Sequence, residues 1–176
     1  ASPVILKAFV LHEKGMAKES LENLLIAFKM ERQHPALHFA FCQIHRKLGN
    51  AKTSDRACII AAQQHHKNPL AHYEYAQTLM AMGNPVEALK ELTQSENLDP
   101  KNSSYPYEKG MIFIYQNNND EAEKSFKKAL SVNDKNIEAA YQLAYLYATQ
   151  DKSELSKTYV NKVLEMGLQH PKVESA

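Results

Sequence analysis

The chain has 176 residues, of which 44% are hydrophobic and 23% charged, and its formal net charge at pH 7 is +1. This balance excludes the strongly basic character of a nucleic-acid-binding protein, and no apolar run approaches the roughly 18 residues that span a bilayer. Five glycines and seven prolines leave little room for strand turns, which indicates an all-α chain.

The sequence repeats with a period of 34 residues, and five consecutive blocks stay in register from Ala1 to His170. The eighth residue of each block is small, and so is the twentieth. In block order these residues are Ala8, Cys42, Ala76, Gly110 and Ala144, then Ser20, Ser54, Ala88, Ala122 and Ser156. A fixed period of this length is typical of a helical solenoid in which each block is one helical hairpin. We expect a single array over residues 1–170, with repeats 1–34, 35–68, 69–102, 103–136 and 137–170 and a tail at 171–176.

In chain order, each block predicts a first helix, a turn and a second helix. The turns are expected at residues 14–15, 49–50, 83–84, 117–119 and 150–151. In the third block Pro69 begins the first helix, and Gly83 ends it because glycine readily adopts the left-handed conformation that closes helices. Pro85 begins the second helix, which runs to about Leu98. Small residues at the eighth and twentieth places allow the two helices to approach to about 8 Å.

Two blocks carry the clearest family pattern. The third has Ala76, Gly83, Ala88, Leu92 and Pro100, and the fourth has Gly110, Ala122, Phe126 and Ala129. In these residues the sequence resembles the tetratricopeptide repeat family, and the resemblance covers residues 1–170. It implies an all-α superhelix of helical hairpins that serves as a protein–protein interaction scaffold, with neither catalysis nor a cofactor of its own.

The resemblance also implies a concave strip on the first helices, formed by the fifth, ninth and twelfth residues of each block. It consists of Ile5, Phe9, His12, Phe39, Gln43, Arg46, Tyr73, Gln77, Met80, Tyr107, Met111, Ile114, Tyr141, Tyr145 and Ala148. The strip is unusually apolar, and aromatic and methionine side chains suit a surface that accommodates a partner. We expect it to bind a peptide or amphipathic helix of another protein. The alternative for Phe39, Tyr73, Tyr107 and Tyr141 is a mainly structural role between repeats.

Two other functions can be weighed on the sequence. Co-chaperone members of the family hold a carboxylate with Lys, Asn and Arg side chains, but the strip offers only Arg46 with Lys47 beside it, so we expect no such clamp. No nucleophile motif or glycine-rich phosphate loop is present, and we expect no enzymatic activity. The alternative is that the array is the partner- or substrate-selecting arm of a longer enzyme, such as a glycosyl- or sulfo-transferase.

The cysteines and histidines are interpreted as structural. We expect Cys42 and Cys58 to be free buried thiols; a bridge between them is the alternative, which would matter in an oxidising compartment. Six histidines lie in the first two blocks: His12, His34, His38, His45, His65 and His66. No metal site is expected, because their spacing matches no known ligand motif. The plain repeats suggest a bacterial source, and the absence of a signal peptide slightly favours the cytoplasm.

The last predicted helix, over about 153–166, carries more apolar residues than one hairpin partner can cover. They are Leu155, Tyr159, Val160, Val163, Leu164 and Met166. Contiguous apolar surface invites a partner, so either the native protein continues or this end self-associates with a second copy. Residues 1–68 carry a net charge of +5 and residues 69–176 a net charge of −4, which would favour such self-association.

Overall fold

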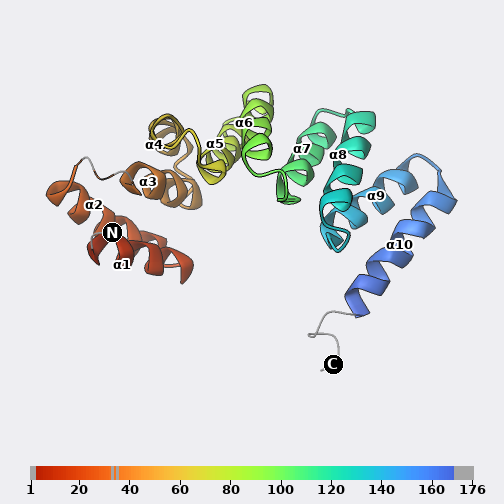
Figure 1. Ribbon diagram of the computed structural model, residues 1–176, viewed down its shortest axis with the longest axis horizontal. Coiled ribbons are helices and arrows are strands. Elements are labelled where there is room, and N and C mark those ends of the chain that lie inside the picture. The colour runs from red at the N-terminus through yellow and green to blue at the C-terminus, as the bar shows by residue number, and fades with distance from the viewer. Residues whose placement is uncertain (1–2, 33, 35, 169–176) are drawn as a thin grey trace. The chain divides into compact units, whose positions relative to one another are not determined.

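The computed structural model describes residues 3–32, 34 and 36–168, which contain ten α-helices and no strand (Figure 1). The helices form five consecutive hairpins, one for each 34-residue block. The hairpins are α1 (Pro3–Glu13) with α2 (Ala17–Met30), α3 (Ala36–Lys47) with α4 (Ala51–Gln64), α5 (Pro69–Ala81) with α6 (Pro85–Leu98), α7 (Ser104–Tyr115) with α8 (Asn119–Val132), and α9 (Ile137–Thr149) with α10 (Ser153–Leu168). The all-α prediction is confirmed.

The contacts divide the chain into two compact units, residues 1–98 and 99–176. In the first unit α2 packs on α3 and α4 packs on α5, so three hairpins are stacked in chain order. In the second unit α8 packs on α9, which stacks the last two hairpins in the same way. The single continuous array remains a prediction.

The turn inside every hairpin has the same backbone conformation. The fifteenth residue of each block has a positive φ: Gly15 at 78°, Gly49 at 74°, Gly83 at 77°, Asn117 at 58° and Asp151 at 57°. The N–H of the following residue then donates to the carbonyl five residues before it, as in Asn84 to Leu79 at 2.9 Å and Lys152 to Tyr147 at 3.0 Å. This is the closure that glycine favours and that asparagine and aspartate tolerate, which confirms the predicted turns.

The side chain of the last residue of a block caps the first helix of the next hairpin. Its side chain accepts a backbone N–H two or three residues further on, in four pairs: Ala36 to His34 at 3.2 Å, Leu70 to Asn68 at 3.0 Å, Ser104 to Asn102 at 3.0 Å, and Ala139 to Asn136 at 2.8 Å. Such a side chain satisfies a helix donor that has no partner inside the helix, and stabilises the helix by about 1 kcal/mol. The periodic asparagine at this place is a sequence signal that the prediction did not use.

Nine of the ten small residues of the hairpin seams are buried and Ser156 is half-buried. The three serines among them also make a hydrogen bond. The hydroxyl of each serine at the twentieth place donates to the carbonyl of the eighth residue of the same block: Ser20 to Ala8, Ser54 to Cys42, and Ser156 to Ala144. The other two blocks have Ala88 and Ala122 there, both fully buried. Thus serine both fits the seam and ties the two helices together.

The expectation of two free thiols is wrong, because Cys42 and Cys58 form a disulfide between α3 and α4. Their Cα atoms are 4.8 Å apart, and both residues are fully buried. They are the eighth and twenty-fourth residues of one block, which face each other across the seam. Disulfides persist in oxidising compartments, where this bridge would be maintained.

Candidate functional site

In the first unit, two polar residues of the concave strip are bound to a buried acid. The Arg46 guanidinium donates from Nε and Nη2 to Glu74 Oε2, at 3.0 and 2.6 Å, and the Gln43 amide donates to Glu74 Oε1 at 3.0 Å. Glu74 is only 8% exposed, and a buried carboxylate needs such charged and polar partners. This cluster joins α3 to α5. Arg46 is therefore held by a carboxylate of its own chain.

The apolar residues of the strip in the first unit are mostly half-buried. Phe39, Tyr73 and Met80 all lie in this class, together with Gln77. Ile5 was expected on the strip, but it is fully buried in the core cluster beside Ala8 and Leu24, so that assignment is wrong. The first unit thus presents a strip whose apolar side chains are partly covered.

In the second unit, the strip residues on α7 are also partly covered. Tyr107, Met111 and Ile114 pack against the buried cluster that joins α8 to α9. The Tyr107 ring lies 5.9 Å from the Phe126 ring, centroid to centroid, and burial raises the pKa of the Tyr107 hydroxyl. These three side chains therefore contribute to the stability of the unit as well as to its surface.

The strip residues on α9 differ, because Tyr141 and Tyr145 are 58% and 60% exposed. They border an apolar pocket of about 310 Å³ between α9 and α10. We call it the terminal pocket, and its lining residues are Tyr141, Ala144, Tyr145, Ala148, Ser156, Val160, Val163 and Leu164. None of these side chains is charged, so the pocket suits an apolar group of a partner.

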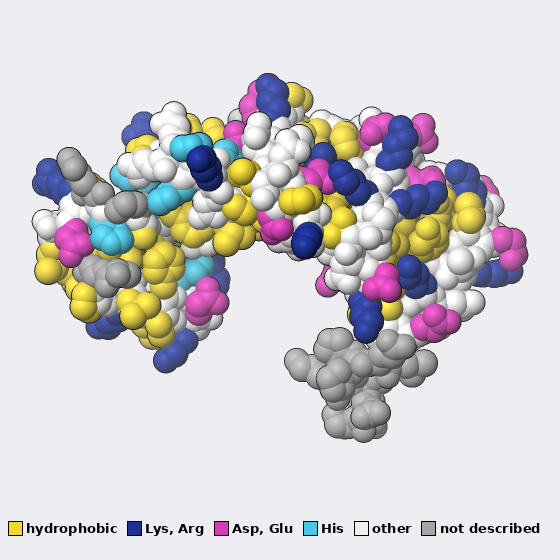
Figure 2. All heavy atoms as spheres, in the orientation of Figure 1, with side chains coloured by type: hydrophobic (Ala, Val, Ile, Leu, Met, Phe, Trp, Pro, Cys, Tyr) yellow, Lys and Arg dark blue, Asp and Glu magenta, His cyan; other side chains and the backbone are white. Residues whose placement is uncertain are grey.

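All histidines that the structure describes lie in the first unit, where Figure 2 shows them gathered. Burial lowers the pKa of His38 and His45. The pKa of His12 is also lowered, mainly by burial and to a lesser extent by the positive charge of Lys47 nearby. His72 contacts the Glu91 carboxylate at 2.7 Å. Among residues 3–32, 34 and 36–168, no group of three His, Cys, Asp or Glu side chains is placed to hold a metal ion.

Sequence reasoning missed Glu74, although a signal for it existed. Arg46 and Gln43 precede it by 28 and 31 residues, close to one repeat period, so stacked hairpins bring them together.

In the described part of the chain, no helix is long and apolar enough to cross a bilayer.

Comparison with known proteins gives the following similarities. The sequence model of the tetratricopeptide repeat matches residues 107–136 and 137–166. No curated protein sequence matches the chain. Among solved structures, MamA 41-end from Desulfovibrio magneticus RS-1 is 15% identical, with a TM-score of 0.83 over 96% of this chain and 95% of that one.

Two further solved structures share the fold. Pseudomonas aeruginosa PilF is 17% identical, with a TM-score of 0.83 over 93% of this chain and 74% of that one. YrrB, described as a TPR protein with an unusual peptide-binding site, is 18% identical, with a TM-score of 0.72 over 97% of this chain and 88% of that one. At these identities, the likeness shows that the chain has the fold of these proteins.

Proposed function

We propose that this chain, which carries tetratricopeptide repeats and has their helical-solenoid fold, is a protein–protein interaction scaffold whose second unit binds an apolar segment of a partner protein. Proteins built from this repeat are typically scaffolds rather than catalysts. The observation that carries the proposal is the terminal pocket, where two tyrosines more than half exposed border an uncharged hollow.

The chemistry of the pocket favours a protein partner. Tyrosine supplies a large contact area with few rotatable bonds, and it is enriched at interfaces because one end is apolar and the other can hydrogen-bond. The peptide-binding site named in the description of YrrB supports the same kind of ligand for a protein of this fold. The strip residues of the first unit are assigned a lesser role, since Arg46 and Gln43 are already bound to Glu74.

A peptide display library tests the proposal. Peptides selected on the wild-type chain should lose binding to a Tyr141→Glu/Tyr145→Glu variant, because a partner would have to bury two carboxylates in an apolar hollow. Tyr115→Glu is the matched control, since Tyr115 is exposed at the end of α7 and lies outside the pocket lining. Selected peptides that bind the double variant as well as they bind the wild type would refute the assignment.

Tyr107 and Met111 are poorer test positions than the two tyrosines of the pocket. Both pack against the buried α8–α9 cluster, so introducing glutamate there would disturb folding as well as binding. Because Tyr141 and Tyr145 are exposed, their substitution should leave the helical circular dichroism of the chain unchanged.

A further inference from the structure

A second apolar pocket lies between α2, α3 and α4, inside the first unit, and has a volume of about 280 Å³. We call it the lateral pocket, and its lining includes Phe28, His38, Phe41, His45, Arg56 and Ala57. The Phe41 ring lies edge-on to Phe28 and stacks on His45, with centroids 6.0 Å apart in both pairs. Because α1 packs on α2 and α5 packs on α4, the pocket lies within the stack of hairpins and not at its end.

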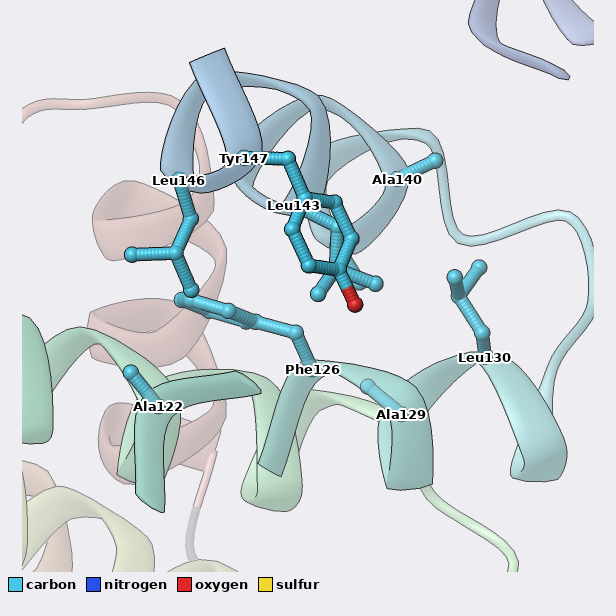
Figure 3. Close-up of a cluster of buried hydrophobic side chains, with 9 residues drawn as sticks. Ala122, Phe126, Ala129, Leu130, Ala140, Leu143, Leu146 and Tyr147 are labelled. Atoms are coloured by element: carbon cyan, nitrogen blue, oxygen red, sulfur yellow. The ribbon is translucent and has the colours of Figure 1, made fainter. Parts of the chain in front are cut away.

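The second unit shows which group fills the equivalent space. The eleventh residue of a block is His45 in the second repeat and Tyr147 in the fifth, and the twenty-third is Ala57 in the second and Tyr159 in the fifth. Tyr147 points from α9 towards α8 (Figure 3). The Tyr159 ring packs on it, with the two centroids 5.6 Å apart. The lateral pocket is therefore opened by the small side chain of Ala57, at a place where another repeat carries an aromatic ring.

The third repeat places an acid in the same space. Its fourth and twenty-third residues are His72 and Glu91, and the His72 Nδ1 and Glu91 Oε2 atoms lie 2.7 Å apart. The second repeat has His38 at the fourth place, but Ala57 offers it no carboxylate. Next to Ala57, Arg56 is exposed at the pocket, and none of the described residues forms an ion pair with it. The equivalent places thus hold an aromatic ring or a carboxylate, and the lateral pocket holds neither.

We propose that the lateral pocket binds an aromatic side chain of a partner protein, together with an aspartate or glutamate next to it in the partner's sequence. The ring enters the space beside Ala57 and packs on His45, as the tyrosine of the fifth repeat packs at the equivalent place. The carboxylate pairs with Arg56, because a planar guanidinium matches the geometry of a carboxylate. This site goes beyond the proposed function, since it is separate from the terminal pocket and takes a charged ligand.

The charge of the surroundings favours an acidic partner. Residues 1–68 carry a net charge of +5, which attracts an acidic segment. A second copy of this chain fits less well, because its exposed aromatic side chains are Tyr115, Tyr141 and Tyr145, and none of them has an acidic neighbour in the sequence. Residues 1–2, 33, 35 and 169–176 contain no aromatic residue of the Phe, Tyr or Trp type. We therefore assign the acidic aromatic motif to a partner protein.

The probe for the experiment is the pentapeptide acetyl-Ser-Glu-Trp-Glu-Ser-amide, which has an acid on each side of the ring. The chain contains no tryptophan, so tryptophan fluorescence reports on the peptide alone. Titration with the full chain should shift the emission to shorter wavelength and saturate, because the indole moves from water into an apolar pocket. The uncharged peptide acetyl-Ser-Gln-Trp-Gln-Ser-amide should bind at least about tenfold more weakly.

Two variants and a matched control locate the site. Arg56→Glu should weaken binding of the acidic peptide at least about tenfold, because it reverses the charge that meets the carboxylate. Lys52→Glu makes the same change of net charge at an exposed residue of α4 outside the pocket lining. It should weaken binding far less at physiological salt, which screens charges that do not touch the ligand. Ala57→Tyr places the tyrosine of the fifth repeat in the pocket and should abolish binding.

The effect of Arg56→Glu should depend on the charge of the peptide. It should change binding of the uncharged peptide little, because that peptide has no carboxylate to pair with the arginine. Arg56 is exposed, so this variant should keep its helical circular dichroism. If Ala57→Tyr does not fold because the pocket is overpacked, the two peptides on Arg56→Glu still decide the outcome.

Absence of saturable peptide binding, or equal losses with Arg56→Glu and Lys52→Glu, would overturn the inference. If Tyr141→Glu/Tyr145→Glu loses the acidic peptide while Arg56→Glu keeps it, the inference fails and the proposed function stands. If library-selected peptides ignore the two tyrosines while the acidic peptide depends on Arg56, the proposed function fails and the inference stands. A chain that is dimeric by light scattering, and becomes monomeric with Ala57→Tyr, would overturn the inference in favour of a second copy.

Discussion

The pairing of Gly110 with Phe126 leads to a prediction that can be worked out from the structure. A Cβ atom added to Gly110 would lie 2.5 Å from Phe126 Cε1 and 2.7 Å from Cδ1, both inside van der Waals contact. The Phe126 ring is fully buried, so the ring and its neighbours must move to admit a methyl group. The first and third repeats instead pair alanine with leucine at these two places, as Ala8 with Leu24.

Two effects of Gly110→Ala oppose each other. Overpacking of a core costs about 1–3 kcal/mol, whereas alanine inside a helix is favoured over glycine by about 1 kcal/mol. The clash is with a buried ring, so we expect overpacking to win, with a net loss of about 1 kcal/mol. Phe126→Leu alone leaves a cavity and should lose on the order of 1 kcal/mol.

The double variant Gly110→Ala/Phe126→Leu recreates the alanine–leucine pair of the first and third repeats. It should be nearly as stable as the wild type, which gives a favourable coupling of about 1–2 kcal/mol for residues in direct contact. Urea unfolding followed by circular dichroism at 222 nm measures all four members of the cycle. Additive effects, with coupling under about 0.5 kcal/mol, would show that the two residues do not compete for the same space.

Three further predictions follow from the first unit. The Cys42–Cys58 bridge has a sequence separation of 16 residues and should stabilise by about 3 kcal/mol, so a reductant should lower the melting temperature of the wild type but not of a double alanine variant. Arg46→Met should cost about 1–3 kcal/mol in urea unfolding because it removes the guanidinium from the buried carboxylate, and adding Glu74→Gln should recover part of that loss. Burial lowers the pKa of His45 in the folded chain. As the pH falls below 6.5, the unfolded chain therefore binds more protons than the folded chain does. The urea midpoint should therefore fall as the pH drops below 6.5 and level off below the lowered pKa, with a smaller fall in His45→Leu; a flat profile would contradict this.

The sequence was sufficient for the features that are encoded locally. The turn at Gly83 needs only a residue that tolerates a positive φ. The helix that begins at Pro85 can start with proline because the backbone N–H of a first helical residue has no partner inside the helix. Because the period is 34 residues, each of these local signals recurs in all five blocks. For this reason the number of hairpins, their turns and their small seam residues could be predicted without any long-range contact.

Tertiary structure decided the features that depend on partners far apart in the chain. Arg46 was predicted on the strip, but its pairing with Glu74 requires the stacking of two hairpins. The sequence favours free thiols at the two cysteines over a bridge, whereas the folded seam places their Cα atoms 4.8 Å apart and joins them. Tyr107 and Tyr141 occupy the same place in their repeats, yet one is half-buried and the other exposed. The sequence determines which face each tyrosine occupies, whereas its burial depends on whether another helix packs beside it.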